Sequence, residues 1–226
     1  MMLRVLSRTH LNLPILAYDF GQPTDPKILI LGGIHGDETE GVACAKALVA
    51  SFLKDFPFKL QVTIIPEANP DGCLLNTRTN SRGVDLNRNL PTKDWSAEIK
   101  SERYHPGTSA LSEVENQALV EELKTGVKFV LSLHSWKPIL NVNGDCLQEA
   151  ETLSKLTGYG IDQDIGYPTP GCLGTYAGLE RDIPTLTYEI ERGLKTDLVI
   201  QNHVPSILEM LKVSERIRKN EFTKIN

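Results

Sequence analysis

The stretch KILILGGIHGDE, residues 27–38, runs from a short apolar segment into a loop that carries one histidine and two carboxylates. Residues 27–31 are typical of a buried β-strand, and the glycine pair at 32–33 ends that strand. After the stretch, apolar residues recur at helical spacing and predict a helix from about Glu38 to Leu53. The stretch therefore predicts a strand–loop–helix unit whose polar side chains lie at the carboxyl end of the strand, where ligands bind in α/β sheets.

The rest of the chain continues this alternation of strands and helices. Short apolar runs predict further strands over Leu13–Phe20 (an edge strand), Leu60–Ile65, Val127–Leu133 and Thr185–Ile190. A capping-box pattern at Ser112 predicts a helix that ends near Lys124, and apolar residues between 200 and 211 predict a C-terminal helix. Residues 67–110 are polar and rich in turn-forming residues, which predicts a long functional loop region. With no repeat or linker, residues 1–226 are predicted to form a single α/β domain with a mixed, largely parallel sheet flanked by helices.

Composition and charge narrow the class of protein. The 226 residues include 24 lysines and arginines against 29 acidic residues, a net charge of −5 that argues against a nucleic-acid partner. No apolar run is long enough to cross a membrane, and polar residues interrupt the N-terminal segment, which predicts no cleaved signal peptide. The 4 cysteines form no C-x-x-C pair and are predicted to be free thiols, so a cytoplasmic location is expected.

Three residues that follow predicted strands suggest a metal site. His35 and Glu38 form an H-x-x-E pair directly after the first strand, and His134 closes another buried strand. Imidazole nitrogen and carboxylate oxygen suit Zn²⁺, and a catalytic zinc site takes three protein ligands and a water. H-x-x-E alone is weak, since a solvent-facing loop histidine is the common alternative. Glu189, on an otherwise apolar strand, is either a functional group or an exposed-face residue, and Glu191 competes with it.

The segment RTNSRGVDLNRN, residues 78–89, contains three arginines with asparagines between them and no apolar periodicity. Arginine binds carboxylates through two parallel hydrogen bonds, and asparagine amides add directional ones. A solvated polar loop is the alternative interpretation. The segment therefore admits a carboxylate-binding function without establishing it.

Taken in order, five motifs resemble those of the zinc metallocarboxypeptidases of the carboxypeptidase A type. Within that superfamily the chain is most similar to the compact bacterial murein tripeptide amidases, which cut the γ-D-glutamyl–diaminopimelate bond. The motifs are HGDE (35–38), NPDG (69–72), RTNSRGVDLNRN (78–89), LHS (133–135) and TYE (187–189). The resemblance spans most of the chain, and it implies the fold of that superfamily and a zinc-dependent hydrolase.

The resemblance also implies a role for individual residues. Arg78 matches the arginine that stabilises the oxyanion, with Arg82 as its competitor, and Glu189 matches the general base. Asp85 matches an aspartate that accepts a hydrogen bond from the first zinc histidine, which fixes the ring orientation. The matches to zinc ligands are His35, Glu38 and His134, and the matches to the pair that binds the terminal carboxylate are Asn87 and Arg88.

Two further residues are expected in the pocket through the resemblance. Tyr167 is the candidate for the mobile tyrosine of the family, although its spacing to the next loop is one residue shorter than in the pancreatic-type enzymes. Tyr176 is the second candidate, and a structural tyrosine is the alternative for both. Leu173, in the loop that lines the specificity pocket, is expected to contact the departing residue.

The function implied is a zinc-dependent, exo-acting peptidase or amidase that uses one zinc ion. Its expected substrate is a small peptide with a free carboxylate, namely the γ-D-glutamyl-diaminopimelate bond of murein peptides, with no nucleic-acid or membrane partner. One alternative is an N-acyl amino acid hydrolase that resembles succinylglutamate desuccinylase and aspartoacylase. That branch typically has HGNE where this chain has HGDE at 35–38. A second alternative is a binding protein that keeps the pocket without catalysis.

Overall fold

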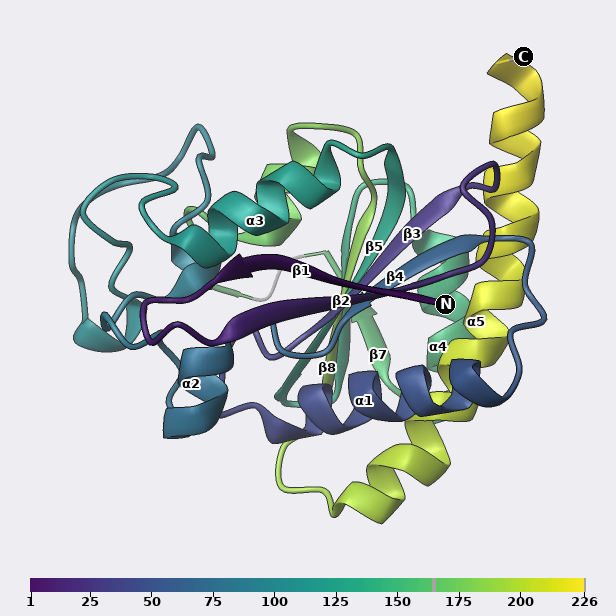
Figure 1. The fold of residues 1–226 in the computed structure, drawn as a ribbon, viewed down its shortest axis with the longest axis horizontal. Helices are drawn as coiled ribbons and strands as arrows, with labels where there is room; N and C mark the ends of the chain where they lie inside the picture. The colour runs from purple at the N-terminus through teal and green to yellow at the C-terminus, as the bar shows by residue number, and fades with distance from the viewer. Residues whose placement is uncertain (164–165, 226) are drawn as a thin grey trace.

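Eight strands form one mixed sheet with helices on both faces (Figure 1). The computed structural model describes residues 1–163 and 166–225, and only the backbone of residues 220–225. The strand order is β1-β2-β4-β3-β5-β8-β6-β7, and the four central strands, β4, β3, β5 and β8, are parallel. The strands are β1 (Met2–Arg8), β2 (Pro14–Phe20), β3 (Lys27–Gly32), β4 (Gln61–Ile65), β5 (Val127–Trp136), β6 (Ile139–Asn143), β7 (Gly160–Asp162) and β8 (Thr185–Glu191). The predicted fold class is therefore confirmed.

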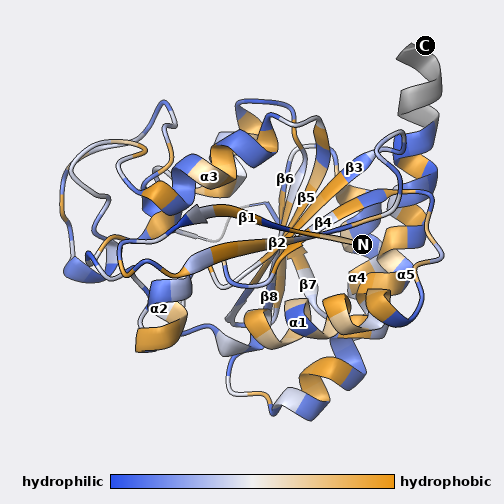
Figure 2. Cartoon of the chain, viewed as in Figure 1, coloured by the Kyte–Doolittle hydropathy of each residue, from blue (hydrophilic) through white to orange (hydrophobic). Residues whose placement is uncertain are grey.

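The helices divide the apolar core into two layers, one on each face of the sheet. Side chains of α1, α4 and α5 belong to one buried cluster, and those of α3 and η3 belong to the other. Figure 2 shows the centre of the sheet between these layers as largely hydrophobic, and β3 is buried along its entire length. The helices are α1 (Thr39–Lys54), α2 (Pro70–Leu75), α3 (Val114–Leu123), α4 (Leu147–Thr157) and α5 (Thr196–Ile225), with short turns η1 (Leu86–Arg88), η2 (Glu102–Tyr104) and the π-type η3 (Gly174–Leu179).

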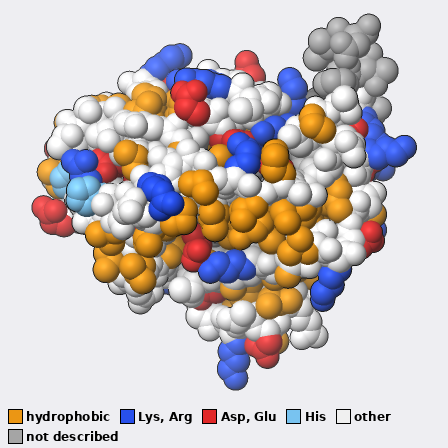
Figure 3. Space-filling view, in the orientation of Figure 1, with side chains coloured by type: hydrophobic (Ala, Val, Ile, Leu, Met, Phe, Trp, Pro, Cys, Tyr) orange, Lys and Arg blue, Asp and Glu red, His pale blue; other side chains and the backbone are white. Residues whose placement is uncertain are grey.

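Two predictions about individual elements are wrong, and a third is incomplete. The strand predicted as an edge is internal, because β1 pairs with it on its outer side. β1 is mostly exposed and so lacks the buried face that a sequence pattern can reveal; Figure 3 shows hydrophobic side chains gathered over this hairpin. Ser112 does not cap α3: its hydroxyl donates to the Glu113 carboxylate, and the helix begins at Val114. The loop region 67–110 contains α2, η1 and η2.

The parallel centre of the sheet determines where the functional groups meet. Because β3, β5 and β8 are neighbours and run in the same direction, their carboxyl ends lie at one edge of the sheet. His134 and Glu189 are direct partners in the ladder between β5 and β8. No described helix is sufficiently long and apolar to span a membrane.

A buried cluster of charges connects the N-terminal hairpin to α3. Arg4 donates from Nε to Asp19 at 2.5 Å and from Nη1 to Glu122 at 3.0 Å, and Lys27 Nζ donates to Glu122 at 2.6 Å. Burial alone would raise the pKa of Asp19 and Glu122, but the hydrogen bonds from these cations outweigh it and lower both pKa values. The cluster thus stabilises the fold only while its carboxylates are ionised.

We expect Glu122→Gln to lower the free energy of unfolding by about 2 kcal/mol at pH 7 and by less at pH 3. A carboxyl whose pKa is lower in the folded chain stabilises fully above its unfolded pKa, about 4, and this contribution disappears as the pH falls through the folded value. Urea unfolding at both pH values measures the difference. Glu121→Gln, at an exposed neighbour on the same helix, should change little at either pH. An equal loss from Glu122→Gln at both pH values would contradict this prediction.

Candidate active site

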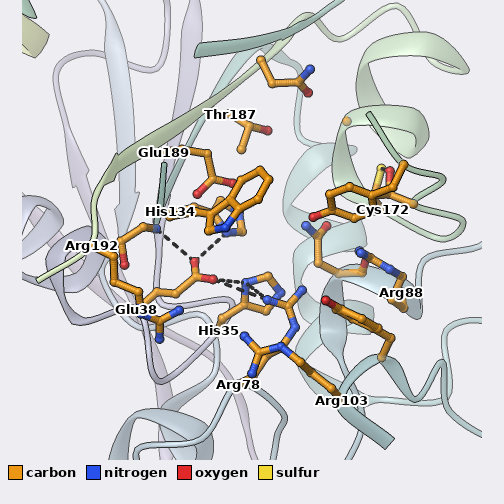
Figure 4. Close-up of a pocket in the computed structure, with 18 of the residues that line it drawn as sticks. His35, Glu38, Arg78, Arg88, Arg103, His134, Cys172, Thr187, Glu189 and Arg192 are labelled. Atoms are coloured by element: carbon orange, nitrogen blue, oxygen red, sulfur yellow. Dashed lines mark hydrogen bonds and ion pairs between the residues drawn. The ribbon is translucent and has the colours of Figure 1, made fainter. Parts of the chain in front are cut away.

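A cavity of about 410 Å³ opens at the carboxyl edge of the sheet. It is lined by residues from β5, β6, β8 and the loops after β3, β4 and β7, as Figure 4 shows for its labelled side chains. Most of the residues singled out by the sequence meet here. They are His35, Glu38, Arg78, Asn87, Arg88, His134, Tyr167 and Glu189.

His35, Glu38 and His134 form one compact group. Their ligand atoms all lie within 4.8 Å of one another, and all three residues are buried. The Glu38 carboxylate lies between the two rings, at 2.8 Å from His35 Nδ1 and 2.9 Å from His134 Nδ1. On the far side of each ring, Nε2 contacts Asp85 in one case and Ser132 in the other, at 3.1 and 3.0 Å. These outer contacts orient both rings so that their Nδ1 atoms face the same point as the carboxylate.

The loop that carries His35 is shaped by close packing against α2. A Cβ atom at Gly36 would lie 1.9 Å from the carbonyl carbon of Gly72, so this approach requires glycine. Asn69 caps α2 by accepting from the Gly72 amide at 2.9 Å, and its own amide group donates to the Ile34 carbonyl at 3.3 Å. Asn69 and Gly72 of the NPDG motif therefore support the loop beneath the site, and the motif does not line the cavity.

Asp85 connects the His–Glu–His group (His35, Glu38 and His134) to the arginine-rich segment 78–89. The Asp85 carboxylate is fully buried and contacts His35 Nε2 at 3.1 Å through Oδ1. It accepts a hydrogen bond from the backbone N–H of Asn87 at 2.9 Å through Oδ1, and one from Arg78 Nε at 2.9 Å through Oδ2. Burial alone would raise the pKa of Asp85, but His35 and Arg78 hold it well below its usual range. One ionised carboxylate thus positions three different site residues.

Arg78 and Arg88 line the cavity next to the Tyr104 ring. Their guanidinium carbons lie 5.2 and 5.3 Å from the ring centre, within the distance of a cation–π contact. Arg78 also approaches the His–Glu–His group, with its Nη1 atom 3.5 Å from Glu38 Oε1. Asn87 Oδ1 accepts from the Leu173 backbone N–H at 2.9 Å, which leaves the N–H donors of the Asn87 side chain for the cavity that Asn87 lines beside Arg88. The arrangement offers two separate places for negative charge.

Glu189 lies beside the His–Glu–His group, and one of its carboxylate oxygens has no hydrogen-bonding partner among the described residues. Its Oε2 atom is buried and unpaired among the described residues. Burial raises the pKa of Glu189, which favours the proton-accepting behaviour expected of a general base. Glu191, the competing carboxylate, is exposed and does not line the cavity.

The structure separates the other competing residues. Tyr167 lines the cavity and is 42 % exposed, with its ring edge-on to Trp136, whereas Tyr176 is buried in the core. Arg82 is half exposed, lies 3.8 Å from Glu113 and does not reach the cavity. The expectation for Leu173 is not met: its side chain is buried in the core and does not line the cavity, and its backbone N–H donates to the site residue Asn87.

Sequence reasoning missed several residues that line the cavity. Thr187 and Trp136 lie two positions from Glu189 and His134, and the two-residue period of a strand could have placed them on the same face. Most of the others come from loops or from the missed strand β6 and had no such signal. They include Arg103, Tyr104, Asn141, Asn143, Cys172 and Arg192.

The residues present fit a zinc ion. Two imidazole nitrogens and one carboxylate are the donor set that catalytic zinc sites use, and both rings have the outer hydrogen bonds that such ligands usually make. The unpaired Glu189 oxygen beside the group leaves a polar atom free to contact a water. The geometry therefore accommodates one metal-assisted hydrolytic centre.

Comparison with known proteins agrees with this geometry. Murein peptide amidase A of Vibrio campbellii is 32 % identical over 220 residues, which cover 89 % of this chain and 84 % of that protein. Murein peptide amidase A of Escherichia coli K12 is 30 % identical over 191 residues, covering 75 % and 73 %. The crystal structure of murein-tripeptide amidase from Escherichia coli O157 superimposes with a TM-score of 0.75 at 23 % identity, over 93 % of this chain and 90 % of that one, which shows the same fold.

The sequence profile of the zinc carboxypeptidase family matches residues 2–189. This match includes the compact His–Glu–His group, the arginine segment and β8 as far as Glu189. Families of this description are hydrolases that use zinc. The chain belongs to the zinc carboxypeptidase family.

Proposed function

We propose that this protein hydrolyses murein peptides at the amide bond between a γ-D-glutamyl residue and diaminopimelate, with one zinc ion and residues 1–226 as a single catalytic domain. The observation that carries the proposal is the presence, in one cavity, of the His–Glu–His group, the Glu189 carboxylate and the Asn87–Arg88 pair. The murein peptide amidases among the relatives supply the substrate class. The family match does not favour the alternative of an N-acyl amino acid hydrolase.

Each residue then has a distinct task. Asn87 and Arg88 bind the free carboxylate of the departing residue, which places the neighbouring amide bond near Glu189. Glu189 accepts a proton from the attacking water and delivers it to the leaving amine. Arg78 donates hydrogen bonds to the oxyanion that develops at the carbonyl. Tyr167, at the mouth of the cavity, covers the bound substrate.

His35, Glu38 and His134 would hold the zinc ion. The chemistry that zinc supplies in such a site is Lewis acidity, which favours the ionisation of water and stabilises negative charge. Asp85 keeps the His35 ring in the required orientation. The free thiols of all four cysteines support a cytoplasmic location.

A hydrolysis assay with matched peptides tests this function. We expect the zinc-loaded protein to cleave L-Ala-γ-D-Glu-diaminopimelate, and to cleave the same peptide with its adjoining diaminopimelate carboxylate amidated at least tenfold more slowly, since a charge-assisted bond contributes about 1.5–3 kcal/mol. N-acetyl and N-succinyl amino acids serve as the comparison for the alternative. Cleavage of ordinary C-terminal peptides alone would leave a zinc peptidase but exclude murein peptides as the substrate.

A further inference from the structure

Two arginines in the cavity, Arg103 and Arg192, have no task in the reaction described above. Arg103 belongs to η2 and Arg192 follows β8, so the fold brings them together from distant parts of the sequence. Their side chains are 50 % and 39 % exposed. Both can therefore reach a ligand in the cavity without any rearrangement of the core.

The two guanidinium groups share one carboxylate, that of Asp37. Arg192 Nη2 lies 2.8 Å from Asp37 Oδ2 and also donates to the Asp37 carbonyl at 2.8 Å, whereas Arg103 Nη2 lies 4.0 Å from the same carboxylate oxygen. Two positive charges against one negative charge leave this corner of the cavity with a net positive charge. Asp37 holds Arg192 through a single nitrogen, so the other N–H donors of its guanidinium remain for a ligand.

Within this corner, Arg192 lies across the cavity from the pair that binds the departing residue. In Figure 4, Arg192 is on one side of Glu38, and Arg88 and Cys172 are on the opposite side. A substrate whose free carboxylate is held at Arg88 and whose amide bond lies at Glu189 must extend its retained acyl part toward Arg192 and Arg103. The acyl part is thus the portion that meets the excess positive charge.

We propose that Arg103 and Arg192 bind a carboxylate on the retained acyl residue, namely the α-carboxylate of a γ-linked glutamate. In a γ-glutamyl amide the side-chain carboxyl forms the scissile bond, and the α-carboxylate stays free a few bonds away. The site therefore selects acyl residues with their own negative charge, and an ordinary α-linked peptide lacks this group at that position. This inference rests on the proposed function and adds to it the recognition of the acyl side.

The test compares two peptides that differ at one group. One is L-Ala-γ-D-Glu-diaminopimelate, and the other carries D-isoglutamine, whose α-carboxamide has nearly the same shape without the charge. We expect the native protein to show kcat/KM about tenfold or more in favour of the carboxylate peptide. Arg192→Gln and, separately, Arg103→Gln should each lower kcat/KM for the carboxylate peptide about tenfold and leave the carboxamide peptide within about twofold.

Arg82→Gln is the matched control, because Arg82 is 47 % exposed and lies outside the cavity; it should change neither value. Thermal unfolding of each variant shows whether the variant is folded. If one of the two arginine variants does not fold, the other still tests the proposal. If the native protein cleaves both peptides equally, or if both variants keep the native ratio, the arginines only hold Asp37 and the inference is wrong while the proposed function stands. If the native protein cleaves neither peptide, the proposed function is wrong and the inference with it.

Discussion

Replacement of Glu189 by glutamine is expected to lower kcat about 10³-fold, with little change in zinc content or KM. Glutamine keeps the size and a hydrogen-bonding oxygen, but it cannot accept a proton at neutral pH. Burial raises the pKa of the Glu189 carboxyl, and its Oε2 atom has no hydrogen-bonding partner among the described residues. The loss should therefore fall on the chemical step and spare substrate binding.

The control for this prediction is the neighbouring carboxylate. Glu191→Gln alters the same strand at an exposed position outside the cavity and should keep near-native kcat. Zinc content per chain, measured on both purified variants, separates loss of the base from loss of the metal. Near-native turnover by Glu189→Gln would show that another group accepts the proton, and a metal-free Glu189→Gln variant would show that Glu189 helps to hold the ion.

The sequence was sufficient where a residue followed a buried strand. The strand from Lys27 contains a continuous apolar run and the one from Val127 is mostly apolar, because helices cover both faces of a parallel sheet. Residues at the ends of such strands must meet at one edge, so His35, His134 and Glu189 could be grouped before any coordinates. The roles proposed for them came from the family resemblance.

Contacts between distant loops could not be predicted in the same way. Tyr104 contacts both Arg78 and Arg88 through tertiary packing of η2, and no periodicity in the sequence predicts these contacts. Leu173 shows the complementary error: its loop was placed correctly, but the direction of its side chain depends on how η3 packs against the core. β1 was missed because an exposed edge strand has no buried face to give alternation.

Asp85 is the residue whose loss should affect the largest number of site residues at once. Its Oδ1 atom contacts His35 Nε2 and accepts from the backbone N–H of Asn87, and its Oδ2 atom accepts from Arg78 Nε. An asparagine side chain has a single acceptor oxygen and presents an N–H₂ group on its other side. It would leave at least one of these donors without a partner, and it would remove the negative charge beside the Arg78 guanidinium.

We expect Asp85→Asn to weaken zinc binding about 10- to 100-fold, because His35 loses the contact that orients its ring. The free energy of unfolding of the metal-free protein should fall by about 3 kcal/mol, since Arg78 would remain buried without its carboxylate. Competition with a chromogenic chelator measures the first effect, and urea unfolding in the presence of a chelator measures the second.

Asp71→Asn is the matched control for this prediction. Asp71 is equally buried but accepts hydrogen bonds from Thr9 and Ser81 outside the cavity, so the substitution should reduce stability and leave zinc affinity unchanged. If Asp85→Asn bound zinc within about twofold of the native protein, ring orientation would not depend on this carboxylate, and the His35 ring would have to be held by Glu38 and the packing against His134 alone.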